Sequence, residues 1–139
     1  FVREILDARV FREPAEGHLY ALAIDPALTL AMDRAHLHQI LDNLVSNAAR
    51  YASGKPGAVR LWAEALPHAK VALHVQDDGP GFDEAMRAHL FEPFFTTHPK
   101  GTGLGLYIAR ELAEANDAGL TLGSGAPGAD FILTASQQP

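Results

Sequence analysis

Three polar side chains lie at helical spacing on one segment of the chain. Asn43, Asn47 and Arg50 occupy positions i, i+4 and i+7, so in a helix they share one stripe, with Tyr51 beside them. A single asparagine in a helix is by default a solvent-facing residue, because its local bonding favours caps and turns. Two asparagines aligned with a cation and an aromatic ring indicate instead a row of side chains that faces a ligand. An amide oxygen is a hard, neutral ligand suited to Mg²⁺, which leaves its remaining positions to phosphate and water.

A carboxylate followed by a glycine-rich turn is the second candidate. Residues 71–76 alternate apolar and polar side chains like a half-buried strand, and Asp77 has the parity of the apolar ones. An inward carboxylate costs free energy unless it gains a partner, and the turn with Gly79 and Gly81 leaves room for a ligand that donates hydrogen bonds. The alternative is that Asp77 accepts from backbone amides of its own turn. On this stretch alone that alternative is favoured.

Three alternate glycines, Gly101, Gly103 and Gly105, open a further expected helix. They let the backbone come close to a ligand and aim free amides and the positive helix end at it. Such a start suits a polyphosphate. The alternative is a flexible loop entry, because this glycine pattern by itself is a weak signal.

Hydrophobic periodicity and turn residues predict the elements that position these groups. The row of polar residues belongs to a long helix, which Asp33 caps and a Ser-Gly-Lys-Pro sequence ends. Residues 90–97, rich in phenylalanine and interrupted by proline, fit neither a helix nor a strand, and the polar C terminus, 136–139, is expected to fray. We expect helices at 1–11, 33–52, 83–89 and 101–115, and strands at 18–24, 28–32, 58–66, 71–77, 120–122 and 130–135.

The composition limits the class of protein. A chain of 139 residues, 47% hydrophobic and 20% charged, describes one globular domain covering residues 1–139. The net charge of −6 argues mildly against a nucleic-acid partner. The absence of cysteine excludes disulfides and thiolate metal sites, and no apolar run is long enough to cross a bilayer. Because the chain begins at Phe1 within an expected helix, we expect a domain of a longer protein.

Four ordered boxes resemble the catalytic ATP-binding domain of sensor histidine kinases, within the GHKL or Bergerat-type fold family shared with gyrase, heat-shock chaperones and MutL. They are the N box (33–51), the first G box (77–81), the F box (90–95) and the second G box (101–106). The resemblance implies an α/β fold, a two-layer sandwich with a mixed sheet of about five strands under three helices. It also implies a lid over the nucleotide at about 96–100, with Phe91 and Phe94 anchoring its base.

The resemblance also implies roles for single residues. Asn47 would ligate Mg²⁺, Asn43 would lie near the phosphates, and Arg50 would contact phosphate where the family often has lysine; these three are the expected catalytic residues. Asp77 would accept from the adenine exocyclic amine, and Tyr51 would stack on adenine. The implied ATP-binding residues are Asn43, Asn47, Arg50, Tyr51, Asp77, Gly79, Gly81, Phe82, Lys100, Gly101, Thr102, Gly103, Leu104, Gly105 and Leu106.

The expected chemistry is phosphoryl transfer from Mg-ATP, in which the metal, amides and a cation position the γ-phosphate. In kinases of this family the acceptor is a histidine on a separate helical dimerisation domain, and none of the seven histidines here lies in that context. We therefore expect a monomeric piece of a homodimeric kinase that acts on a response regulator. The resemblance fits a cytoplasmic domain of a protein anchored in the inner membrane. Residues 105–116 resemble NtrB-type kinases and, among them, PilS-like sensors of type IV pilus regulation.

Other functions are weighed against the kinase. ATP-hydrolysing clamps, and serine kinases that act on anti-sigma partners, use a glutamate base at the first N-box position, and Asn43 cannot take a proton. A metal-hydrolase interpretation of the histidines has no supporting spacing. A degenerate domain that binds nucleotide without kinase activity, or serves only as an interaction module, stays open.

Overall fold

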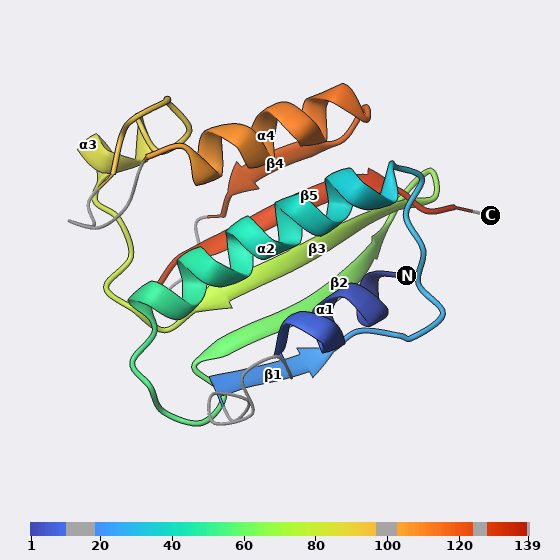
Figure 1. The fold of residues 1–139 in the computed structure, drawn as a ribbon, viewed down its shortest axis with the longest axis horizontal. Helices are drawn as coiled ribbons and strands as arrows, with labels where there is room; N and C mark the ends of the chain where they lie inside the picture. Colours follow the sequence, from blue (N-terminus) through green and yellow to red (C-terminus); the bar gives the residue numbers. More distant parts are fainter. Residues whose placement is uncertain (11–18, 97–102, 124–127, 139) are drawn as a thin grey trace.

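One mixed sheet forms the base of the fold (Figure 1). The structure is a computed structural model, and it describes residues 1–10, 19–96, 103–123 and 128–138. The helices and strands follow one another as α1 (Val2–Val10), β1 (Tyr20–Ala23), α2 (Arg34–Tyr51), β2 (Val59–Leu66), β3 (Lys70–Asp77), α3 (Glu84–Arg87), α4 (Gly105–Ala115), β4 (Gly119–Leu122) and β5 (Asp130–Ser136). The strand order is β1-β2-β3-β5-β4, with β1 parallel to β2 and every other neighbouring pair antiparallel.

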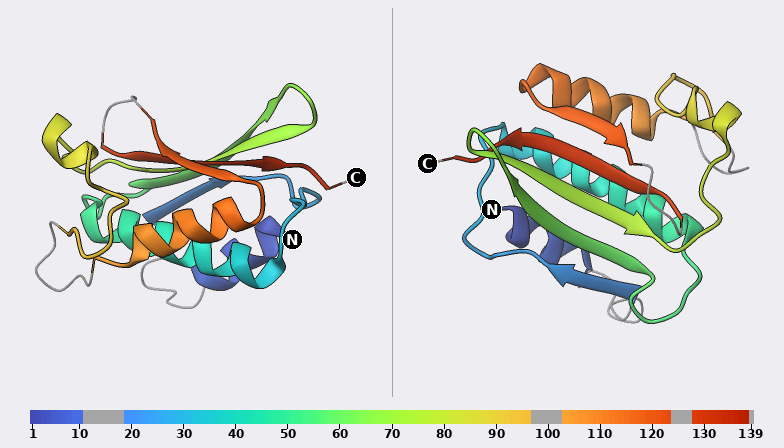
Figure 2. Two further views of the ribbon diagram at one scale, coloured as in Figure 1. Left: turned by 90° about the horizontal axis from the view of Figure 1, so that it is seen from above. Right: turned by 180° about the vertical axis from the view of Figure 1, so that it is seen from behind.

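The helices α1, α2 and α4 cover one face of this sheet, as the view from above in Figure 2 shows. The single turn α3 lies at one end of the molecule, beyond the end of α2 (Figure 1). The predicted α/β sandwich, with a mixed five-stranded sheet under three helices, is confirmed. None of the helices in the described part of the chain combines the length and the apolar character needed to cross a membrane.

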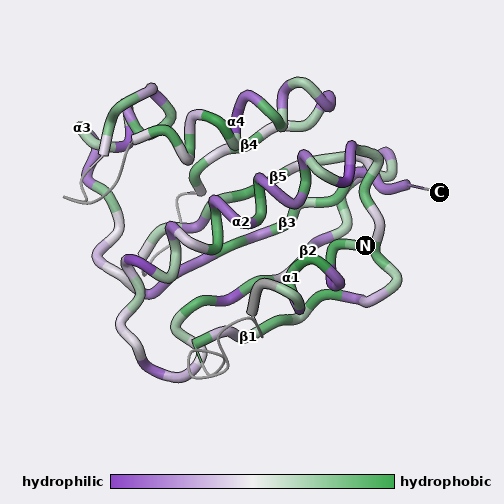
Figure 3. Tube along the Cα trace, in the orientation of Figure 1, coloured by the Kyte–Doolittle hydropathy of each residue, from purple (hydrophilic) through white to green (hydrophobic). Residues whose placement is uncertain are grey.

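The helix α2 starts and packs as its sequence dictates. The side chain of Asp33 accepts a hydrogen bond from the backbone N–H of His36 at 2.9 Å, which caps the first turn. Figure 3 shows apolar and polar residues alternating along the turns of this helix. Its apolar stripe faces the sheet, so the polar stripe is left at the side of the layer. The buried residues of the stripe are Leu37, Ile40, Leu41, Leu44, Val45 and Ala48.

The strand β3 carries the alternation predicted for it into the centre of the sheet. It lies between β2 and β5, and its inward residues Val71, Leu73 and Val75 are buried. Asp77 follows the same parity and is only 2% exposed. The strand therefore delivers a carboxylate to the inner side of the sheet at the end that lies near the C terminus of α2.

Two sequence-based expectations, a strand at 28–32 and a frayed C terminus, are wrong, and the contact between these two segments explains both. Residues 28–32 do not form a strand, because only Leu30 makes an isolated β-bridge, to Gln137. The C-terminal segment is not frayed at that position, since the backbone N–H of Gln137 also donates to the carbonyl of Ala69 at 2.7 Å. The two segments bind each other although more than a hundred residues separate them.

Candidate functional site

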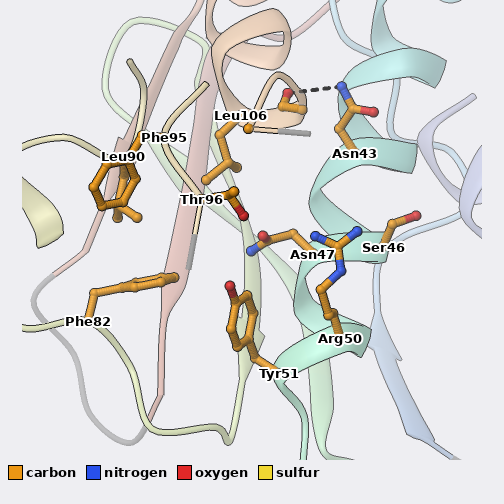
Figure 4. A pocket seen from close by; sticks show the side chains of 12 residues that line it. Asn43, Ser46, Asn47, Arg50, Tyr51, Phe82, Leu90, Phe95, Thr96 and Leu106 are labelled. Atoms are coloured by element: carbon orange, nitrogen blue, oxygen red, sulfur yellow. Dashed lines mark hydrogen bonds between the residues drawn. The ribbon is translucent and has the colours of Figure 1, made fainter. Parts of the chain in front are cut away.

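A pocket of about 230 Å³ lies beside α2, opposite the turn after β3 and the start of α4 (Figure 4). Mostly polar side chains from α2 form one wall, and mostly apolar side chains from the turn and from the segment before α4 form the other. The residues that line it are Asn43, Ser46, Asn47, Arg50, Tyr51, Phe82, Leu90, Phe95, Thr96, Gly103, Gly105 and Leu106.

The structure brings most of the predicted site residues to this pocket. Asp77, Gly79, Gly81 and Leu104 do not line it, although the first three belong to the turn that adjoins it. Lys100, Gly101 and Thr102 lie outside the described residues. The predicted residues on the pocket wall are Asn43, Asn47, Arg50, Tyr51, Phe82, Gly103, Gly105 and Leu106.

Asn47 brings an unsatisfied amide to the wall. Its Nδ2 atom is buried and has no hydrogen-bond partner among the described residues. A buried polar group without a partner is costly, and native proteins leave few of them. The Asn47 amide therefore has bonding capacity that the protein does not use and that a ligand in the pocket would satisfy.

Asn43 and Asn116 bind α2 and α4 to each other at two places. The Nδ2 of Asn43 donates to the carbonyl of Gly105 at 3.0 Å, the bond drawn in Figure 4, while its Oδ1 accepts from Gln39 at 3.0 Å. At the other end, the Oδ1 of Asn116 accepts from the backbone N–H of Asp33 at 2.9 Å. These bonds fix the distance between the polar side of α2 and the beginning of α4, which together frame the pocket.

The N terminus of α4 faces this frame without a side-chain cap. Its N-cap residue, Leu104, makes no capping side-chain hydrogen bond in the described structure, and Gly105 and Leu106 line the pocket. The first N–H groups of a helix have no partner within the helix, and they and the positive end of this eleven-residue helix attract an anion. Gly103 is required before it, because φ is +76° and a Cβ would collide with the backbone of Phe94.

Asp77 is held within its own turn, as the simpler interpretation of the sequence predicted. Its Oδ1 accepts from the backbone N–H of Gly79 at 2.8 Å. Burial raises the pKa of the Asp77 carboxyl, and the hydrogen bonds from the Gly79 and Ala129 backbone oppose that rise only in part. A carboxylate offers about four acceptor positions, so the hydrogen bonds from these backbone groups leave capacity for a ligand as well.

The aromatic wall of the pocket is anchored in the core. The rings of Tyr51 and Phe82 meet edge to face, with centroids 5.7 Å apart, and Phe82 meets Phe131 in the same way at 6.4 Å. Phe131 is fully buried on β5. A wall of this kind offers a rigid apolar surface that suits one face or edge of a planar ring.

Sequence reasoning missed part of the pocket. Ser46 lies three residues after Asn43 and four before Arg50, so the helical spacing that identified its neighbours could also have found it. Leu90 comes from the irregular F box, where no periodicity reports which residues face inward. The predicted anchoring role of Phe94 is wrong for this structure, because its side chain is 75% exposed.

Comparison with known proteins agrees with this geometry. Residues 32–139 match the family of histidine kinase-, DNA gyrase B- and HSP90-like ATPases. The sensor protein kinase PilS of Pseudomonas aeruginosa is 44% identical over 110 residues, which are 77% of this chain and 20% of PilS. The chain therefore spans about a fifth of that relative.

Solved structures of kinases share the fold. Full-length ShkA in complex with AMPPNP superposes with a TM-score of 0.79 at 33% identity, covering 98% of this chain and 29% of ShkA. The catalytic domain of the histidine kinase ThkA gives a TM-score of 0.78 at 30% identity, covering 98% of this chain and 90% of that domain. The chain belongs to the family of histidine kinase-, DNA gyrase B- and HSP90-like ATPases, and its relatives in that family are sensor histidine kinases.

Proposed function

We propose that this chain binds Mg-ATP and donates the γ-phosphoryl group to a histidine on a separate dimerisation domain. The observation that carries the proposal is the meeting, in one pocket, of the unpartnered Asn47 amide, the Arg50 side chain and the uncapped N terminus of α4. An N–H donor, a cation and a helix N terminus are groups that hold and neutralise a polyphosphate.

The proposed metal site uses few protein atoms. No group of three or more His, Cys, Asp or Glu side chains is placed to hold a metal within the ranges that the structure describes. Mg²⁺ keeps several waters and commonly binds through one or two protein oxygens plus substrate phosphates, so the Oδ1 atom of Asn47 would serve as that ligand. The unpartnered Nδ2 can only donate, and it would donate to a ligand oxygen. When bound, Mg²⁺ supplies charge neutralisation at the phosphates.

The protein's own residues would orient the nucleotide around this point. The amides at the start of α4 would bind phosphate oxygens, with Lys100, Gly101 and Thr102 as further proposed contacts. Arg50 would spread the charge that develops on the transferred group. Asp77 would accept from the exocyclic amine of adenine, and the Tyr51 ring would lie against the base.

The proposed partners follow from what this chain does not carry. No histidine in the sequence has the context of a phosphoacceptor, so the acceptor would be supplied by the dimerisation domain of the same kinase. The whole protein would then be a homodimer that presents this domain in the cytoplasm and passes the phosphoryl group to a response regulator.

Two experiments test the proposal in order. Calorimetric titration with a non-hydrolysable ATP analogue and Mg²⁺ should give a dissociation constant in the micromolar range, which corresponds to a binding free energy of about −8 kcal/mol. Incubation with γ-labelled ATP and the dimerisation domain of the same kinase should then label that domain. A folded chain that binds no nucleotide would contradict the proposal and favour an interaction module. A chain that binds ATP but never labels the supplied domain would contradict the transfer step alone.

A further inference from the structure

Asp78, the residue after the buried Asp77, reaches across to the segment that follows α2. Its Oδ1 accepts from the backbone N–H of Ser53 at 2.8 Å, and its Oδ2 accepts from the Ser53 hydroxyl at 2.6 Å. The Ser53 hydroxyl also accepts from the backbone N–H of Lys55 at 3.2 Å. Both carboxylate oxygens are therefore used on a single residue, which is a bidentate and charge-assisted arrangement.

The backbone of Asp78 is fixed as well. Its N–H donates to the carbonyl of Ala58, just before β2, at 3.1 Å. One residue therefore joins the end of β3, the beginning of β2 and the chain that leaves α2. Neither Asp78 nor Ser53 lines the pocket.

The junction held by these bonds has little spare room. The carbonyl of Tyr51, the last residue of α2, lies so close to Gly79 that a Cβ there would collide with it. Gly79 also donates its N–H to Asp77 at 2.8 Å. The end of α2 and the turn after β3 are consequently packed backbone against backbone, with Tyr51 on one side and Asp77 on the other.

We propose that Asp78 and Ser53 form a clasp that positions Tyr51 relative to Asp77 and thereby sets the preference of the pocket for adenine over guanine. The inference rests on the proposed function, in which these two side chains contact the base. Adenine presents an amine where guanine presents a carbonyl oxygen, so a carboxylate attracts the first and repels the second. That discrimination depends on the base being held at one distance from Asp77, which is what the clasp fixes.

The charge state of Asp78 suits a permanent clasp. The side-chain and backbone hydrogen bonds from Ser53 lower the pKa of the Asp78 carboxyl, so it stays ionised and able to accept throughout the neutral range. Acid-range titration of the clasp therefore does not interfere with measurements at pH 7.

The test compares adenine and guanine analogues on the same variants. Affinities for non-hydrolysable ATP and GTP analogues with Mg²⁺ are measured by calorimetry on the wild type, Asp78→Ala, Asp78→Asn, Ser53→Ala and the double alanine variant. The matched control is Asp25→Ala, which removes a similar bond, 2.9 Å from the Ala27 N–H, after β1 at the other end of the sheet (Figure 1). Urea unfolding of each variant reports its stability separately.

The expected result is a loss of selectivity. Asp78→Ala should weaken binding of the ATP analogue by about fivefold to tenfold while changing the GTP analogue less. Ser53→Ala should do less, because its backbone N–H still donates to Asp78, and the double variant should be no worse than Asp78→Ala, because the two residues share one interaction. Asp78→Asn keeps one acceptor oxygen and should be intermediate, and Asp25→Ala should leave both affinities unchanged.

Two results would overturn the inference, and they can be told apart. If wild type binds the ATP analogue and Asp78→Ala changes both affinities by the same factor, or changes only the free energy of unfolding, the clasp is merely structural and the proposed function stands. If the folded wild type binds neither analogue, the inference and the proposed function both fail.

Discussion

Replacing Asp77 by asparagine exchanges one buried oxygen for an NH₂ group of almost the same size. The residue is 2% exposed, and its Oδ1 accepts from the Gly79 N–H at 2.8 Å. An asparagine oxygen can keep that bond, so the turn should survive. Because burial raises the pKa of the Asp77 carboxyl, its charge costs folding free energy at neutral pH, and removing the charge should leave the free energy of unfolding unchanged or higher.

The same change should weaken nucleotide binding strongly. The lost interaction is a hydrogen bond from the adenine amine to a charged acceptor, and bonds of that kind contribute about 1.5–3 kcal/mol. The NH₂ group would face the donor of the base if the oxygen keeps its bond to Gly79. We therefore expect a loss of about 2–3 kcal/mol, which weakens the dissociation constant by about 30- to 150-fold.

Calorimetry with the ATP analogue, beside urea unfolding of both proteins, separates these two effects. A variant that is as stable as wild type but binds at least 30-fold more weakly, by the estimate above, would support the adenine assignment. Retained affinity in a folded variant would remove Asp77 from the proposed site. A variant that no longer folds would refute the reasoning about the turn.

Four further outcomes are expected. Lowering the pH should weaken ATP binding while the pH is still above about 4, the ordinary pKa of aspartate, because the pKa of Asp77 is raised and its carboxylate is protonated first. Over the same range the cost of the buried charge to folding becomes smaller. Binding that persists to lower pH would contradict the raised pKa. Asn47→Ala should remove the difference between affinities measured with Mg²⁺ and with EDTA without lowering stability, since its Nδ2 has no partner among the described residues. Gly79→Ala should weaken nucleotide binding in the same titration, because its Cβ would push against Tyr51. Phe131→Ala, at a fully buried position, should lower the urea-derived free energy of unfolding by about 3–5 kcal/mol, and a loss below about 1 kcal/mol would contradict its anchoring role.

What the sequence predicted correctly is governed by local spacing. The cap at Asp33 and the apolar stripe of α2 are both set by residues within a few positions of each other, and the helix begins and ends within a residue or two of the prediction. The row of Asn43, Asn47 and Arg50 follows from the same helical period, which is why the structure brings all three to one pocket. The inward direction of Asp77 follows from strand alternation.

What it did not predict depends on partners that are distant in the chain. The partner of His74 is one example: the residue is 7% exposed, and its Nδ1 lies 2.9 Å from Asp130 on the neighbouring strand. That contact requires the register in which Gln76 pairs with Asp130, and the two strands that set this register lie far apart in the chain. The bonds of Asn116 to Asp33 and of Asp78 to Ser53 join segments in the same way.

Both edges of the sheet are short. The edge strands β1 and β4 have four residues each, whereas the central strand β3 has eight. An exposed edge is a template on which a second chain can add its own strand, and a brief edge offers few bonds for such an addition. In the proposed homodimer, two copies of this domain would be tethered at high local concentration, where pairing between their sheet edges would compete with phosphoryl transfer. Short edges would keep the copies as separate bodies, each able to meet the acceptor helix on its own.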